Sequence, residues 1–326
     1  MREGLLGWAT EALIRADDQV TGVLSRVLTA APERRQAIFC ALAAHEQNCG
    51  LNFGDELIRP SLAEVVRHGR SADILRFALG EVPSGLRGLL ARVGERPLPR
   101  SKDYLTLCAL AASDDGRGMA ALLGSGNISV RKLEVLSALD PRWRHANTLE
   151  RIDVPAEALT FNAAVGFVQS VNSRATDEVV AAAIAQMRPS STLPRLLDRF
   201  MLGADRLPPH PVPFEDNELR PLRTVRDLLD AGRRYRNCLR HRVSDVAAGK
   251  MAISEFRGEC LVEFRPTGVG WLLRDVHVER NRPVAVALSG AVEAKCDNIG
   301  IPRFDDEIGG DGWKSYRRMT GELEWG

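Results

Sequence analysis

The sequence lacks the features that would commit the chain to a membrane or to a strong electrostatic field. Its 326 residues carry a net charge of only +1, so any attraction to nucleic acid must be local. No apolar run approaches the roughly 20 residues that a membrane-spanning helix needs. The opening MREGLLGWATEALIRADD contains acidic residues and lacks the apolar core of a secretory signal. We therefore expect a cytoplasmic protein with no membrane partner.

The cysteines and glycines form none of the common cofactor motifs. Six cysteines stand at positions 40, 48, 108, 238, 260 and 296, and no two of them form a CxxC pair. Their neighbours are apolar, which is typical of reduced cysteines in a core. The GSGN segment at 124–127 lacks the Lys-Ser/Thr of a phosphate-binding loop and predicts a turn. We predict no cofactor and no metal.

Residues 1–203 read as a succession of short helices. Segments such as ERRQAIFCALAAHEQ and ALTFNAAVGFVQSV place apolar residues at helical spacing, and Gly, Pro, Ser or Asn separates neighbouring segments. This pattern predicts an all-α domain of helical hairpins, arranged like a solenoid or as a compact bundle. Such surfaces commonly bind a protein partner, and a plain helical scaffold is the equal alternative.

Two segments of different composition flank the C-terminal part. Residues 204–222 contain the Pro-rich LPPHPVPF followed by acidic residues, which predicts a linker between domains. Residues 305–326 have several glycines and few apolar anchors, so we predict a C-terminal tail. Between them, residues 223–304 form a second domain.

The second domain combines helices with an antiparallel meander, so the fold class is α+β. Thr224 can cap a helix whose apolar positions recur at three- and four-residue steps, and Gly249 can end it. Three strand-like runs follow, MAISEFRG, ECLVEFRP and GWLLRDVHVERN, with hairpin signals at Gly258 and Gly268. A last helix runs from Pro283 to Ile299.

An arginine stripe marks the first helix of this domain. Arg226, Arg233, Arg236 and Arg240 recur at steps of seven, three and four residues and face mostly away from the apolar stripe. One interpretation is a solvated face partly paired with Asp residues. The other is a surface for DNA or RNA, because the arginine fork matches phosphate oxygens.

Several polar residues suggest chemistry in this domain. Cys238 and His241 lie three residues apart on the expected helix, which would allow a thiol nucleophile with a neighbouring base. A metal site would add Cys260 and His277 to that pair. Arg257 on one expected strand and Glu263 on the next form either a cross-strand ion pair or, with Asn281, part of a polar pocket. We leave open whether the protein is an enzyme.

A family resemblance rests on the same residues. A helix ending in Cys238, Gly249, a strand with Arg257 in SEFRG, a strand with Glu263 in LVEF, and Asn281 in HVERN together resemble the PcfJ-like proteins. The resemblance covers about a fifth of the chain. PcfJ-like proteins occur on bacterial conjugative plasmids, phages and other mobile genetic elements.

Three hypotheses follow. In the first, this is a PcfJ-like accessory protein of a mobile element, whose helical domain binds a protein and whose arginines contact DNA or RNA. In the second, Cys238, His241, Arg257, Glu263 and Asn281 line the pocket of an enzyme. In the third, the chain is an interaction adaptor without a pocket.

Overall fold

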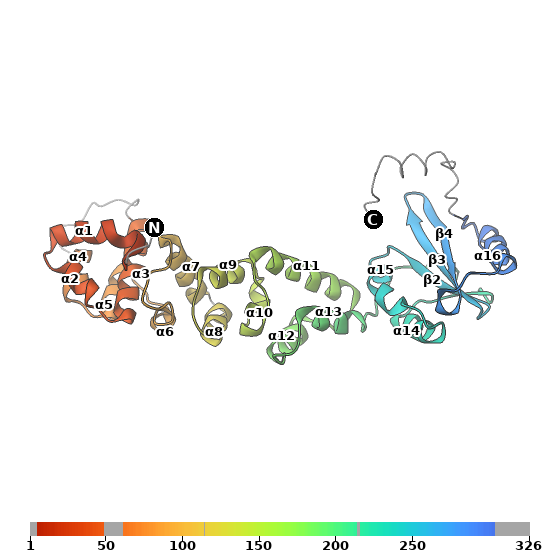
Figure 1. Ribbon diagram of the computed structural model, residues 1–326, viewed down its shortest axis with the longest axis horizontal. Coiled ribbons are helices and arrows are strands. Elements are labelled where there is room, and N and C mark those ends of the chain that lie inside the picture. The colour runs from red at the N-terminus through yellow and green to blue at the C-terminus, as the bar shows by residue number, and fades with distance from the viewer. Residues whose placement is uncertain (1–4, 49–60, 114, 214–215, 304–326) are drawn as a thin grey trace. The chain divides into compact units, whose positions relative to one another are not determined.

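The computed structural model describes residues 5–48, 61–113, 115–213 and 216–303. The chain divides into two compact units (Figure 1). The helical unit comprises Met1–Phe167 and Thr176–Leu197, and the C-terminal unit comprises Val168–Ala175 and Asp198–Gly326. The α+β prediction is confirmed, because helices fill the first unit and a four-stranded antiparallel sheet with flanking helices forms the second. No helix among the described residues is long and apolar enough to cross a membrane.

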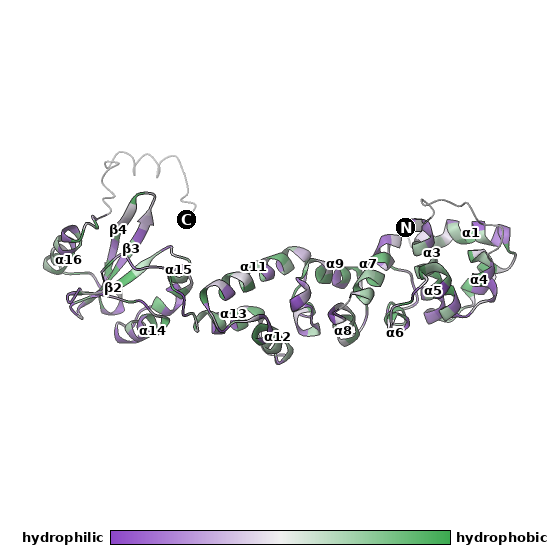
Figure 2. Ribbon diagram, turned by 180° about the vertical axis from the view of Figure 1, so that it is seen from behind, coloured by the Kyte–Doolittle hydropathy of each residue, from purple (hydrophilic) through white to green (hydrophobic). Residues whose placement is uncertain are grey.

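Helices account for most of the described residues among the first two hundred. Most helices here pack against helices that are close in the chain. For example, α3 packs against α5, α6 and α7, and α7 packs against α8 and α9. Each helix carries hydrophobic residues beside hydrophilic ones (Figure 2). The elements are η1 (Gly7–Ala9), α1 (Thr10–Gln19), α2 (Val23–Leu28), α3 (Pro32–Asn48), α4 (Leu62–His68), α5 (Ser71–Leu79), α6 (Leu86–Leu90), α7 (Ser101–Ala112), α8 (Arg117–Gly124), α9 (Val130–Ala138), η2 (Pro141–Trp143), α10 (Ala146–Leu149), α11 (Pro155–Val171), α12 (Asp177–Ala185) and α13 (Leu193–Met201).

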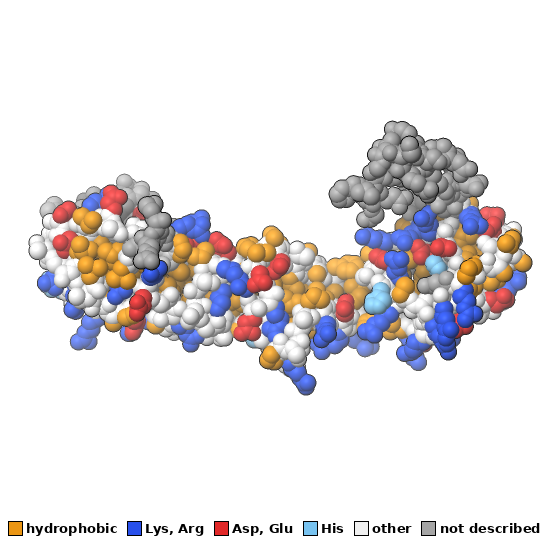
Figure 3. Space-filling view, viewed as in Figure 1, with side chains coloured by type: hydrophobic (Ala, Val, Ile, Leu, Met, Phe, Trp, Pro, Cys, Tyr) orange, Lys and Arg blue, Asp and Glu red, His pale blue; other side chains and the backbone are white. Residues whose placement is uncertain are grey.

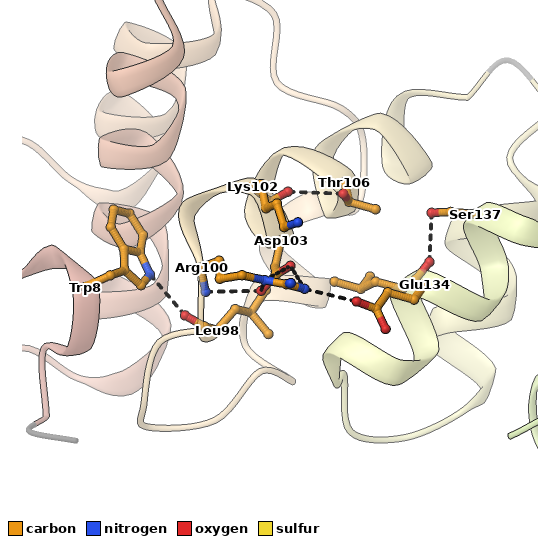
Figure 4. Close-up of polar contacts among 9 residues, drawn as sticks. Trp8, Leu98, Arg100, Lys102, Asp103, Thr106, Glu134 and Ser137 are labelled. Atoms are coloured by element: carbon orange, nitrogen blue, oxygen red, sulfur yellow. Dashed lines mark hydrogen bonds and ion pairs between the residues drawn. The ribbon is translucent and has the colours of Figure 1, made fainter. Parts of the chain in front are cut away.

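Polar contacts fix the start of α7 against its neighbours (Figure 4). Arg100 donates to the buried carboxylate of Asp103 at 2.9 Å and to Glu134 of α9 at 3.0 Å. The indole of Trp8 donates to the Leu98 carbonyl at 3.0 Å. These contacts tie residues that are far apart in the sequence to one helix terminus, and so they set the position of α7 in the helical unit.

A buried hydrogen-bond chain crosses from α3 to α7. Gln36 donates to the carbonyls of Gly94 and Arg96 at 2.9 and 2.7 Å. Its side-chain oxygen accepts from the hydroxyl of Tyr104, which in turn accepts from the Leu98 amide at 3.0 Å. Gln36 and Tyr104 are both fully buried. The polar atoms of this hydrogen-bond network are out of reach of water, so their hydrogen bonds must come from other protein groups.

Replacing Tyr104 by Phe tests how much this hydrogen-bond network contributes to stability. The substitution keeps the ring but leaves the Leu98 amide and the Gln36 side-chain oxygen without a partner in the core. We expect the free energy of unfolding to fall by about 2 kcal/mol, measured by urea denaturation. Lys102→Gln, at an exposed position of the same helix, should change it by less than about 0.5 kcal/mol. Equal losses in the two variants would contradict the argument.

The C-terminal unit is a sheet covered on both faces. Its strands are β1 (Leu219–Pro221), β2 (Ala252–Phe256), β3 (Cys260–Thr267) and β4 (Gly270–His277), paired antiparallel in that order. Its further helices are α14 (Val225–Arg234), η3 (Leu239–Arg242), α15 (Val243–Ala247), η4 (Glu279–Asn281) and α16 (Val286–Asn298). β1 lies in the stretch predicted as a linker, and its Leu219 is buried opposite Phe256.

The alternation of side chains assigns a different role to each face of the sheet. One face carries a hydrophobic core that includes Phe256, Val262 and Phe264, with Val292 and Cys296 of α16 packed onto it. Strand register places Glu255, Glu263 and His277 on the opposite face, because paired residues point to the same side. α14 lies on this second face, where its C-terminal end contacts Glu255.

Candidate nucleic-acid interface

The arginine-rich segment starts as the sequence predicts. The hydroxyl of Thr224 accepts from the Asp227 amide at 3.1 Å, and the carboxylate of Asp227 accepts from the Thr224 amide at 3.1 Å. This reciprocal capping box satisfies amides that the first turn of a helix leaves without partners. Val225 and Leu228 then face the core, which leaves Arg226 on the outside.

The expected continuous helix up to Gly249 is wrong, because α14 ends at Arg234. The Asn237 amide bonds back to the Gly232 carbonyl, and Arg236 between them has a φ of 48°. This is a Schellman ending, in which one left-handed residue reverses the chain and glycine is the usual choice. The chain resumes as η3 and α15. The four predicted arginines consequently come from three local structures: α14, the turn and η3.

Four exposed arginines still occupy this one stretch of surface. Arg226, Arg233 and Arg236 expose 91%, 78% and 60% of their side chains, and Arg240 is also exposed. Asp230 serves two of them, Arg226 at 3.9 Å and Arg233 at shorter range. Lys and Arg side chains gather over and beside α14 in the space-filling view (Figure 3).

The η4 turn brings a further arginine to the same surface. The Arg280 amide donates to the Tyr235 carbonyl at 2.9 Å, so η4 lies against the end of α14. Glu279 of this turn is 3.5 Å from Arg236 and 3.8 Å from Arg280. Arg240 has no ion-pair partner among the residues that the structure describes. We define the arginine face as Arg226, Arg233, Arg236, Arg240 and Arg280. Among the described residues, its ion-pair partners are the carboxylates of Asp230 and Glu279.

A buried carboxylate anchors the base of this surface. Glu255 is 5% exposed and accepts from Arg220 of β1 at 2.8 Å, from Tyr235 at 3.0 Å and from Arg234. Burial raises its pKa, but the bonds from Arg234, Tyr235 and Arg220 lower it more, so the pKa of Glu255 lies below its ordinary value. One charged side chain therefore holds β1, β2 and the end of α14 together.

A second carboxylate on the same face pairs with a histidine. Glu263 accepts from Arg265 at 2.7 Å, and its other oxygen is 3.6 Å from His277 on β4. The contact with Glu263 raises the pKa of His277 against the opposing effect of burial. Burial raises the pKa of Glu263, yet its bonds to His277 and Arg265 give a net lowering. Electrostatic repulsion from Arg242 opposes this increase in the pKa of His277.

In the described part of the structure, two of the residues predicted for a catalytic pocket make side-chain contacts with other partners. Cys238 is exposed instead of buried on an apolar stripe, because α14 ends before it and the helical register is lost. His241 is exposed as well, and its backbone amide donates to the Cys238 carbonyl. Arg257 donates to Glu218 at 2.7 Å, so the predicted pair between Arg257 and Glu263 does not form. The side chain of Asn281 lies outside the described part of the structure.

Two of the residues suggested for a metal site lie on opposite faces of the sheet. Cys260 belongs to the core on the α16 face, whereas His277 lies on the opposite face with Glu263. Across the described residues, no group of three or more His, Cys, Asp or Glu side chains is placed to hold a metal ion.

The residues that anchor the end of α14 beneath the arginine face were not predicted from the sequence. No motif in the sequence marks Glu255, Tyr235 or Arg220, although a Glu within the mostly apolar run AISEF is a usable signal of a buried charge. Arg280 was missed because its approach to Tyr235 depends on the turn after β4.

The structure consists of a helical unit and a small α+β unit that carries the arginine face. Comparison of the chain with protein-family models, curated proteins and solved structures finds no match in any of the three.

The left-handed Arg236 allows stability and binding to be separated. A non-glycine residue in this conformation is strained by about 1 kcal/mol, so Arg236→Gly should raise the free energy of unfolding by about that amount. The same substitution removes one charge from the arginine face, and it should therefore weaken the nucleic-acid binding that is proposed below. Urea denaturation and a binding titration measure the two effects. A variant that is both less stable and undiminished in binding would contradict both assignments.

Proposed function

We propose that the C-terminal unit binds DNA or RNA through the sugar-phosphate backbone, using the arginine face. The observation that carries this proposal is the ratio of charges: among the described residues, Asp230 and Glu279 pair with four of the five exposed arginines, and Arg240 has no ion-pair partner. The chain as a whole has a net charge of +1, so this face is a local excess. A local excess of arginine on an exposed surface is the electrostatic footprint of nucleic-acid binding.

The contacts within the face support phosphate as the ligand. Glu279 lies 3.5 and 3.8 Å from its two arginines, which are long distances for charge-assisted hydrogen bonds. Phosphate oxygens can replace such contacts at little cost and accept two parallel N–H bonds from each guanidinium. Backbone contacts of this type position a nucleic acid without reading its bases. The proposed binding is accordingly tolerant of sequence.

The wider role that we propose is that of a PcfJ-like accessory protein of a mobile genetic element, acting in the cytoplasm. The resemblance in the C-terminal unit supplies this context. In the same proposal the helical unit binds a protein partner. Several large hydrophobic side chains on its helices are exposed and available to such a partner, namely Ile14, Leu28, Phe77, Leu159 and Val179.

A binding titration tests the proposal. Labelled single- and double-stranded DNA and RNA are titrated with the full chain at low and near-physiological salt, and with the triple variant Arg233/Arg236/Arg240→Ala. Supportive behaviour is binding that weakens steeply with salt and depends on these arginines. Absence of binding at low salt would overturn the nucleic-acid proposal.

A further inference from the structure

A pair of thiols faces each other across two helices of the helical unit. The sulfur atoms of Cys40 on α3 and Cys108 on α7 are 3.4 Å apart, and both cysteines are free. A disulfide requires about 2.05 Å between the sulfurs, so they need to approach by roughly 1.4 Å. This pair is separate from the arginine face, and it takes no part in the proposed function.

The packing of α3 and α7 keeps the two sulfurs opposed. Gln36 and Tyr104, which are joined by a hydrogen bond, each lie four residues before one of the cysteines. Two successive contacts at the same spacing mean that the helices run side by side in the same direction over at least one turn. The Gln36–Tyr104 bond prevents either helix from sliding along the other, so the thiols stay at one level.

The two thiols differ in their surroundings. Cys40 is 1% exposed, whereas Cys108 is only partly buried. The hydrogen bond between them raises the pKa of Cys40, which burial raises further, and lowers the pKa of Cys108. Cys108 is thus the thiol that an oxidant reaches and that ionises more readily, and Cys40 is positioned directly behind it.

We propose that Cys40 and Cys108 are an oxidation site that forms a disulfide between α3 and α7 when the protein meets a disulfide oxidant such as oxidised glutathione. The Cys108 thiolate attacks one sulfur of the oxidant, forms a mixed disulfide and releases one glutathione thiolate. Cys40 loses its proton and attacks the Cys108 sulfur, which releases the second glutathione thiolate. The two cysteines lose two electrons and two protons in total, and the oxidant is reduced to two thiols.

This disulfide would close a long loop. It would link residues 40 and 108 and enclose α4, α5 and α6. Because a cross-link of this length restricts the unfolded chain, we expect oxidation to raise the Tm of the helical unit by about 5–10 °C. Treatment with dithiothreitol should reverse the change.

The test is oxidation of the full chain with oxidised glutathione, followed by blocking of free thiols and peptide mapping by mass spectrometry. The expected result is a Cys40–Cys108 peptide pair lighter by two hydrogen atoms, together with the rise in Tm. The exposed Cys238 serves as an internal control, since it should gain glutathione instead. Recovery of Cys40 and Cys108 as blocked free thiols, while Cys238 is modified, would overturn the proposal.

Variants separate this disulfide from other oxidation products. In Cys108→Ala, Cys40 should remain a free thiol and the oxidant should leave the Tm unchanged. Circular dichroism of the untreated variant checks that it folds, and the wild-type peptide map decides the question if it does not. A rise in Tm of the folded Cys108→Ala variant on oxidation would assign the effect to another pair and contradict the proposal.

Discussion

Replacing Arg233, Arg236 and Arg240 by Ala should lower the affinity for nucleic acid by about a hundredfold to a thousandfold at low salt. Each guanidinium that contacts a phosphate releases counterions, so the slope of log affinity against log salt should become shallower by about 2 to 3. The remaining Arg226 and Arg280 should leave weak binding. The measurement is a fluorescence-anisotropy titration over a series of salt concentrations.

A charge-matched variant makes this result specific. Arg15, Arg76 and Arg87 lie on the helical unit and expose 70%, 70% and 56% of their side chains, so replacing all three by Ala removes the same charge elsewhere. This control should keep both the affinity and the salt slope of the wild type. Equal losses in the two triple variants would mean that net charge alone drives binding, and the assignment to the arginine face would be wrong.

The sequence predicts where α14 starts, but it does not predict that this helix ends at Arg234. Thr224 and Asp227 form a local capping signal that can be read from four residues, and α14 starts there. The end at Arg234 has no such signal, because Arg236 adopts a conformation in which glycine is usual. Tyr235 is bonded to Glu255, twenty residues further along the chain. A contact of that range is invisible to a helical periodicity, and the error propagated to Cys238.

The Pro-rich stretch shows the same limit from the other side. Composition predicts that residues 204–222 form a linker, yet His210 bonds to the Ile253 carbonyl at 2.9 Å and Val212 is fully buried. β1 is only three residues long and carries no alternating pattern to detect. The hairpins at Gly258 and Gly268 were predicted correctly, since a tight turn is specified by its own residues. Features specified by neighbouring residues, such as the two hairpin turns, could therefore be predicted from the sequence. Contacts between residues far apart in the sequence, such as the pairing of β1 with β2, could not.

Replacing Glu255 by Gln should lower the stability of the C-terminal unit by about 3 kcal/mol. The amide has the same shape but no charge, so the bonds from Arg220, Arg234 and Tyr235 lose their strongest component. The amide also presents its own N–H groups to a site lined by donors, which leaves at least one buried contact unfavourable. Hydrogen exchange of the full chain should show β2 amides opening about a hundredfold more often, with peptides of the helical unit unchanged.

Acid dependence identifies the charge as the cause of this loss. Because the folded-state pKa of Glu255 lies below its ordinary value of 4.5, its contribution is complete above that pH and disappears as the pH falls through the folded-state pKa. The stability difference between the wild type and Glu255→Gln should therefore be constant near neutral pH and shrink on acidification below about pH 4.5. Glu259→Gln, at an exposed position after β2, should behave like the wild type throughout. A difference that persists unchanged into strong acid would show that the amide disturbs packing, and that the carboxylate charge does not hold β1, β2 and α14 together.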